Sequence, residues 1–313
     1  MKNLIIATRG SVLALWQSEH IKDLIEKKHG IKVELKSMKT KGDVILDTPL
    51  AKIGGKGLFT KELEECMLRE EAHLAVHSLK DVPVVFPEGL VLAAIGARED
   101  ERDAMISEKY ATFADLPRGA KIGTTSLRRK MQLLKMRPDL QIISLRGNVQ
   151  TRLRKLKEGE FDAIILAMAG INRLNLRAEV AHVYSFSLDE MIPAMGQGAL
   201  GIECADKKDL LEILDFINDE NSLIATSLER AFVQRLEGGC QVPIGVNAQV
   251  GADEITVRAI VGLPDASEFI EDKMSVARGD VTAEKAAQIG ANFADKFIAK
   301  GAKELLARAE KMA

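Results

Sequence analysis

Three short segments place arginine beside serine or threonine where a strand is predicted to turn into a helix. They are Arg9-Gly10-Ser11, Gly123 to Arg129, and Leu145 to Arg152. Free N–H groups at a helix N-terminus favour an anion by ~0.3–1 kcal/mol, and hydroxyl groups and arginine forks add charge-assisted hydrogen bonds. These turns predict a cleft for a ligand that carries several carboxylate or phosphate groups.

Positive charge is concentrated in residues 121–157, which hold eleven Lys or Arg against one acidic residue, Asp139, whereas the whole chain has a net charge of −2. A solvated helix face, the usual explanation of a charge run, accounts for the lysines of this window. It accounts less well for the arginines at or just after the turns, which are Arg128, Arg129, Arg146 and Arg152. The window contains no Phe, Tyr or Trp for stacking on bases, so nucleic acid is not an expected partner.

A second group with chemical potential is Lys80-Asp81, which follows a predicted strand in His77-Ser78-Leu79-Lys80-Asp81-Val82-Pro83. The end of a strand favours contact with a ligand, but Asp also commonly starts a turn before proline. From spacing alone, both interpretations of Asp81 stay open. His73 and His77 are expected to pack within the strand, because no Cys or acidic cluster joins them at metal-ligand spacing.

The chain has three cysteines, and their spacing forms neither a disulfide framework nor a zinc motif. Cys66 and Cys204 are expected to be buried and inert. Cys240 lies in the loop Gly238 to Gly245, where flanking glycine favours an exposed, functional thiol over a small buried residue. The glycines 54, 55 and 57 lack the spacing of a P-loop and indicate a lid within a loop from Gly42 to Gly57.

The elements that must position these groups alternate between short apolar runs and helical patterns, which indicates an α/β protein with largely parallel sheets. Strands are predicted at 3–8, 31–40, 73–79, 121–125, 140–145, 161–168 and 199–205, with further antiparallel strands in 242–261 and 269–276. Helices are predicted at 11–28, 58–69, 127–136, 149–156 and 222–236, and as one long element at 283–311. Strand 199–205 is expected to return the chain to the first sheet.

Length and composition limit the class of protein. With 313 residues, 46% of them hydrophobic and 29% charged, the chain is expected to form two or three globular domains. No apolar run approaches the ~18 residues that a membrane span needs. The apolar stretch before Arg9 is too short for a secretory signal, so a cytoplasmic protein is expected.

Several of these motifs, in the same order, resemble the porphobilinogen deaminase (hydroxymethylbilane synthase) family over essentially the whole chain. The resemblance rests on Ala7-Thr8-Arg9 with the residues up to Gln17, Gly55 to Phe59, His77 to Pro83, Thr125 to Arg129, Leu145 to Asn148, and Gly238 to Gly245. It implies a transferase of tetrapyrrole biosynthesis that joins four porphobilinogen molecules head to tail into hydroxymethylbilane and releases four ammonia. It also implies a dipyrromethane cofactor as primer, held by a thioether to Cys240.

The resemblance further implies roles for individual residues. Asp81 aligns with the catalytic aspartate of the family. The implied cofactor-binding residues are Lys80, Thr125, Ser126, Arg128, Arg129, Arg146 and Gly147, and the implied substrate-binding residues are Arg9, Ser11, Arg146, Arg152 and Arg173. Because each pyrrole unit carries an acetate and a propionate, the growing chain needs many cations, and arginine forks match carboxylates best.

The expected architecture is two doubly wound α/β lobes around a cleft, similar to periplasmic binding proteins, plus a small C-terminal α+β domain. Domain 1 comprises residues 1–98 and 197–217, domain 2 residues 99–196, and domain 3 residues 218–313. A monomer is expected, with no metal, nucleic acid or membrane partner. The alternative is a non-catalytic two-lobed receptor for an anionic solute, against which Asp81, Cys240 and the missing export signal argue.

Overall fold

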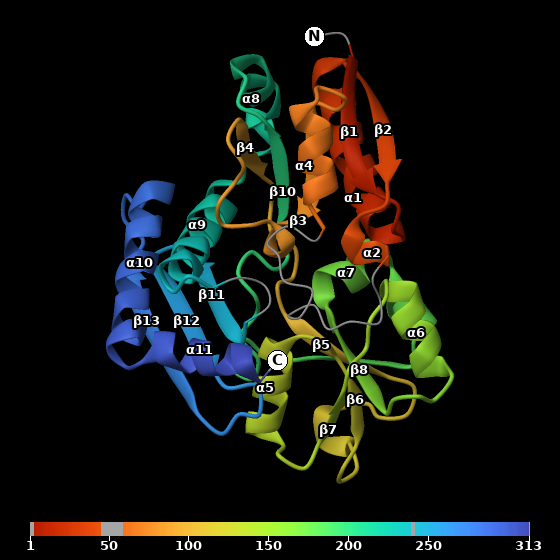
Figure 1. Ribbon diagram of the computed structural model, residues 1–313, viewed down its shortest axis with the longest axis vertical. Helices are drawn as coiled ribbons and strands as arrows, with labels where there is room; N and C mark the ends of the chain where they lie inside the picture. The colour runs from red at the N-terminus through yellow and green to blue at the C-terminus, as the bar shows by residue number, and fades with distance from the viewer. Residues whose placement is uncertain (1–2, 45–58, 239–241, 313) are drawn as a thin grey trace.

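Three β-sheets organise the computed structural model, which describes residues 3–44, 59–238 and 242–312. Two sheets have five strands each, and the third has three. Figure 1 shows the first sheet with its helices at the top, the second below it, and the third, with the long C-terminal helices, to one side. The structure is thus a mixed α/β protein with two sheet-centred lobes and a small C-terminal unit.

The first sheet has the strand order β2-β1-β3-β10-β4. Its strands are β1 (Asn3–Arg9), β2 (Lys32–Met38), β3 (Leu74–Ser78), β4 (Leu90–Ile95) and β10 (Leu200–Ala205). The helices of this lobe are α1 (Val12–His29), α2 (Lys41–Val44), α4 (Lys61–Leu68) and α8 (Lys208–Leu214). Helix α1 begins where the Ser11 side chain accepts from Ala14 N and ends at Gly30, whose φ of 65° suits glycine.

The second sheet has the order β7-β6-β8-β5-β9. Its strands are β5 (Asp103–Ser107), β6 (Lys121–Gly123), β7 (Gln141–Ile143), β8 (Ala163–Ala167) and β9 (His182–Ser185). Its helices are α5 (Leu127–Met136), α6 (Val149–Lys157) and α7 (Met168–Arg173). Alternate residues of β8 pack into two different apolar clusters, because successive side chains of a strand point to opposite faces.

Each of these sheets contains one reversed strand, and in both it is the strand that the chain enters on crossing from the other lobe. The first crossing, residues 96–102, leads from β4 to β5, and the second crossing, residues 186–199, leads from β9 to β10. Strand β5 pairs antiparallel with β8 and β9, and β10 pairs antiparallel with β3 and β4. The remaining pairs, β1 with β2 and β3, and β6 with β7 and β8, are parallel. The prediction of largely parallel sheets and of a strand that returns to the first sheet is confirmed.

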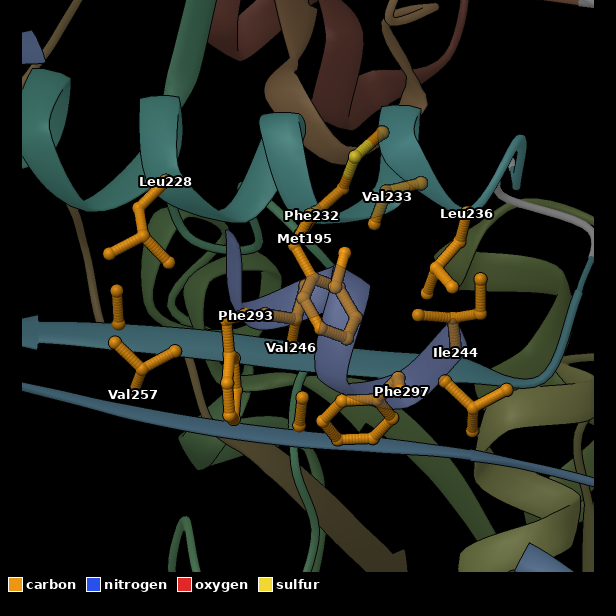
Figure 2. Packing of buried hydrophobic residues seen from close by; sticks show 14 of the residues in the cluster. Met195, Leu228, Phe232, Val233, Leu236, Ile244, Val246, Val257, Phe293 and Phe297 are labelled. Atoms are coloured by element: carbon orange, nitrogen blue, oxygen red, sulfur yellow. The ribbon is translucent and has the colours of Figure 1, made fainter. Parts of the chain in front are cut away.

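The third sheet, β11-β12-β13, is antiparallel and is covered by helices. Its elements are β11 (Ile244–Val250), β12 (Glu254–Gly262), β13 (Phe269–Ala277), α9 (Glu220–Arg235), α10 (Ala283–Ala299) and α11 (Ala302–Lys311). Figure 2 shows the side chains of Phe232, Phe293 and Phe297 grouped beside the strands, and the ring centroids of Phe232 in α9 and Phe297 in α10 are 5.1 Å apart. This cluster fixes both helices on the sheet.

The structure corrects some of the predicted elements. The single helix predicted at 283–311 is two helices, α10 and α11, because Gly301 at φ 92° interrupts the helical backbone. Residues 42–44 of the predicted loop belong to the short helix α2, and its residues 45–57, the lid glycines included, lie outside the described residues. Strands β4, β5 and β9 were missed, since their short apolar runs carry no clear period.

Within the described residues, no helix is long and apolar enough to cross a membrane.

Candidate active site

Lys80 and Asp81 lie in a 3₁₀ turn, Leu79–Asp81, that directly follows β3. Leu79 between the strand and these two residues is fully buried, and Val82 N closes the turn by donating to Leu79 O at 3.1 Å. A Cβ built on Gly196 would come within 2.8 Å of Leu79 Cγ, so the second crossing between the lobes packs tightly under the turn. Both side chains are half-buried, directly after the end of the strand.

Arg128 and Arg129 of α5 are buried and share one carboxylate, Asp103 at the start of β5. Arg128 Nη1 donates to Asp103 Oδ2 at 2.6 Å, and Arg129 Nη2 donates to Asp103 Oδ1 at 2.7 Å. Burial by itself would raise the pKa of Asp103, but the two guanidinium groups outweigh it and hold that pKa well below its usual range. Two cations against one anion leave a net positive charge in a water-poor environment.

Lys80 of the first lobe is connected to this cluster through Gln197, on the second crossing. Lys80 Nζ donates to Gln197 Oε1 at 3.2 Å, and Gln197 Nε2 donates to Asp103 Oδ1 at 3.0 Å. Burial and the neighbouring Arg129 lower the pKa of Lys80 to about 8, although Asp81 and Asp103 oppose the shift. The turn after β3 and the start of α5 therefore belong to one electrostatic cluster.

Arg152 of α6 is the third arginine that interacts with this cluster. Its Nε donates to Gly147 O at 2.8 Å, in a turn where Gly147 has φ 111° and the side chain of Asn148 caps the helix. Burial and Arg129 lower the pKa of Arg152 to about 10, while Asp81 raises it. Arg146 contributes to the same lowering, so Arg146, Arg152 and Asp81 interact electrostatically across the two lobes.

The remaining predicted contacts take up more local positions. Arg9 stacks on Phe59, with its Cζ 4.3 Å from the ring centroid. Ser11 and Ser126 cap α1 and α5 by accepting from backbone N–H groups, which uses a lone pair and not the O–H. Thr125 Oγ1 donates to Leu145 O at 3.5 Å.

Arg173 lies at the end of α7 and donates from Nη2 to Gly198 O at 2.7 Å, which fixes it to the second crossing. Burial lowers the pKa of Arg173 to about 10. One of its N–H groups is thus committed to the backbone of the protein itself.

The cysteines and histidines that the structure describes take the structural positions expected from the sequence. Cys66 and Cys204 are buried, and burial raises the pKa of the Cys204 thiol to about 12. His77 is buried beside Glu203, with Nε2 3.1 Å from Oε2, and His73 Nδ1 accepts from Ile5 N. Cys240 lies outside the described residues. Within them, no group of His, Cys, Asp and Glu is arranged to hold a metal ion.

Sequence reasoning missed Asp103 and Gln197, two members of the cluster that link its cations to one another. Asp103 stands at the start of a strand that was not predicted, and Gln197 is an uncharged residue between two glycines just before the predicted strand 199–205. Their partners lie 25 to 117 residues away in the chain. No local pattern carries that information.

The fold and the site define a two-lobed α/β protein that gathers Lys80, Arg128, Arg129 and Arg152 from both lobes into one electrostatic cluster with Asp81 and Asp103. Such a donor set fits a ligand with several carboxylates, since charge-assisted hydrogen bonds from arginine match that geometry.

Comparison with known proteins gives the family. A family model described as "Porphobilinogen deaminase, dipyromethane cofactor binding domain" matches residues 4–212, and one described as "Porphobilinogen deaminase, C-terminal domain" matches residues 223–299. The porphobilinogen deaminase of Campylobacter concisus is 71% identical over 314 residues, covering 100% of both chains. That of Campylobacter jejuni is 64% identical over 309 residues, covering 99% of both. The chain therefore belongs to the porphobilinogen deaminase family.

Its activity follows from that membership: it is a transferase of tetrapyrrole biosynthesis that joins four porphobilinogen molecules head to tail into hydroxymethylbilane, releases four ammonia, and uses a dipyrromethane cofactor. Solved structures that match include a periplasmic binding protein of Salmonella typhimurium with high arginine specificity, 14% identical over 69% of this chain and 92% of that one, with a TM-score of 0.41. The periplasmic aliphatic sulphonate binding protein of Escherichia coli is 16% identical over 76% and 71%, with a TM-score of 0.39.

Proposed function

We propose that Asp81 is the catalytic carboxylate of this reaction. Loss of ammonia from porphobilinogen leaves a delocalised cation, and joining it to the next pyrrole releases a proton. A carboxylate held beside the ring nitrogens stabilises this cation and accepts the released proton. The observation that supports this role is the electrostatic coupling of Asp81 to Lys80 and Arg152, which lie in different lobes.

The dipyrromethane cofactor, when bound, would supply the terminal pyrrole to which the first unit is joined, and each later unit would join the pyrrole added before it. Cys240 is its proposed attachment point, on the resemblance of the loop Gly238 to Gly245 to the family motif. The residues proposed to hold its carboxylates are Lys80, Thr125, Ser126, Arg128, Arg129, Arg146 and Gly147. The positive surplus of Arg128 and Arg129 over Asp103 fits this role, because a polycarboxylate would neutralise it.

The incoming porphobilinogen is proposed to meet Arg9, Ser11, Arg146, Arg152 and Arg173. Of these, Arg152 interacts electrostatically with both Arg146 and Asp81. This arrangement suits groups that steer an anionic substrate toward the Asp81 carboxylate. Arg173, tied to Gly198 O, is suited to hold a carboxylate at the crossing.

We also propose three domains: domain 1 comprises residues 1–98 and 197–217, domain 2 residues 99–196, and domain 3 residues 218–313. It also includes a cytoplasmic monomer that acts without nucleic acid or a membrane. The solute-receptor alternative is not proposed, since family membership supports catalysis.

The test of the catalytic role is Asp81→Asn, which keeps the size of the side chain and removes its charge. We expect turnover to fall by about 10²–10⁴-fold, the range for a lost acid–base group, with the cofactor still attached by intact mass. The matched control is Asp23→Asn on the exposed face of α1, which should keep full turnover. Turnover of Asp81→Asn within a few-fold of the parent chain would remove Asp81 from the mechanism.

A further inference from the structure

Gln197 is a buried residue at the middle of the second crossing between the two lobes, with 1% of its surface exposed. Its backbone carbonyl accepts from Arg98 Nε at 2.8 Å, which ties it to the first crossing. A buried amide has two N–H donors and a carbonyl that must all find partners, so the identity of those partners shows what the side chain does.

Every polar atom of the Gln197 side chain has a partner. Nε2 donates to Glu101 O at 2.7 Å and to Asp103 Oδ1 at 3.0 Å, and Oε1 faces Lys80 Nζ at 3.2 Å and Arg128 Nη2 at 3.5 Å. The reverse orientation would set the amide N–H groups against two cations and its oxygen against a carboxylate. The charges around Gln197 therefore fix the orientation of its amide.

Lys80 depends on this amide. In the part of the chain that the structure describes, Gln197 Oε1 is the acceptor to which Lys80 Nζ donates. Among the charged groups around it, Arg129 and Arg128 repel the ammonium, whereas Asp81 and Asp103 attract it. Without an acceptor on this side, the Lys80 side chain would turn away from the arginines or lose its proton.

We propose that Gln197 is a positioning residue of the active site, which holds the Lys80 ammonium of one lobe and the Arg128 guanidinium of the other in a fixed relation to Asp103. The inference rests on the proposed function in one respect, the role of Lys80 as a carboxylate-binding cation. A neutral amide suits this role because it orients both cations by hydrogen bonds without neutralising them. Their positive charge is then available to bind the ligand's carboxylates. A carboxylate at this position would pair with them permanently and compete with the carboxylates of the pyrrole chain.

The test compares Gln197→Leu and Gln197→Glu with the parent holoenzyme. The pKa of Lys80 is measured from the pH dependence of competitive amine labelling, read by peptide mass spectrometry, and kcat/KM is followed over the same pH range. In Gln197→Leu we expect the pKa of Lys80 to fall by about one, the change that matches one lost hydrogen bond, and the alkaline fall of kcat/KM to move to lower pH with it. In Gln197→Glu, both should move upward.

The matched control is Gln132→Leu. Gln132 is another buried glutamine, but its amide bonds backbone atoms: Oε1 accepts from Ile192 N at 2.7 Å, and Nε2 donates to Ile192 O at 3.0 Å and to Arg128 O at 3.4 Å. Its loss should lower stability and leave the pKa of Lys80 unchanged. If Gln197→Leu does not fold, Gln197→Glu carries the test, because it keeps an acceptor facing Lys80.

An unchanged Lys80 pKa in both folded Gln197 variants, or the same change in Gln132→Leu, would overturn the proposal. A shifted Lys80 pKa with an unshifted activity profile would support Gln197 as a positioning residue and remove Lys80 from the proposed binding role. The labelling result and the activity result thus separate the failure of the inference from the failure of the proposed function.

Discussion

At the scale of single residues, the site combines buried groups whose charges do not cancel. Asp103 compensates one of the two guanidinium groups beside it, and Lys80 keeps a pKa of about 8 because burial and Arg129 work against its charge. Taking such cations out of water costs several kcal/mol per ion unless partners compensate. A ligand rich in carboxylates recovers part of that cost, so the uncompensated positive charge suits the site to such a ligand.

A prediction at this scale concerns Cys240. The intact mass of the purified protein should exceed that of the bare chain by two deaminated porphobilinogen units, and Cys240→Ser should lose that excess completely. Cys66→Ser is the matched control and should keep it, since its thiol is buried. A protein isolated at the bare mass should gain the excess after incubation with porphobilinogen. An excess that persists in Cys240→Ser would place the attachment elsewhere.

At the scale of elements, the Leu79–Asp81 turn is positioned by the second crossing beneath it. Gly196 has φ 66° and leaves no room for a Cβ against Leu79, whereas Gly30 has φ 65° and open space around it. Alanine in place of either Gly196 or Gly30 lowers stability by about 1 kcal/mol, because a Cβ disfavours the left-handed backbone. Gly196→Ala also forces its Cβ against the fully buried side chain of Leu79.

We therefore expect Gly196→Ala to lower the free energy of unfolding by about 1–3 kcal/mol more than Gly30→Ala, and to reduce kcat by displacing Lys80 and Asp81. Gly30→Ala should leave kcat unchanged. Urea unfolding and steady-state rates measure the two effects. Equal stability and equal kcat in the two variants would mean that Leu79 yields without moving the turn.

The elements themselves were largely predictable because their signals are local. Ser11 and Gly30 bound α1 at both ends, and the helix Leu127–Met136 was predicted with its observed bounds. The break at Gly301 was missed, because the apolar pattern continues through it. Lys80, Arg128 and Arg152 were found from their positions after strands, whereas Asp103 and Gln197 act through partners remote in sequence.

At the scale of the whole molecule, the three units meet at one buried ion pair. Arg98, on the first crossing, donates from Nη1 to Glu229 Oε1 at 2.7 Å and from Nη2 to Oε2 at 3.1 Å. Glu229 of α9 also accepts from Gly196 N at 2.6 Å on the second crossing and from Ala248 N at 2.8 Å on β11. The pair therefore ties both crossings to the third sheet.

Breaking this pair should uncouple the units. Glu229→Gln keeps the shape but leaves Arg98 buried without its counter-charge, so the free energy of unfolding should fall by about 3–5 kcal/mol and urea unfolding should separate into two transitions. The control is Asp295→Asn, which breaks the exposed pair with Arg235 and should cost no more than about 1 kcal/mol in a single transition. Fluorescence and circular dichroism, followed together, measure both. If Glu229→Gln unfolds in one transition with the midpoint of the parent chain, the lobes and the third sheet are held together by their apolar contacts instead.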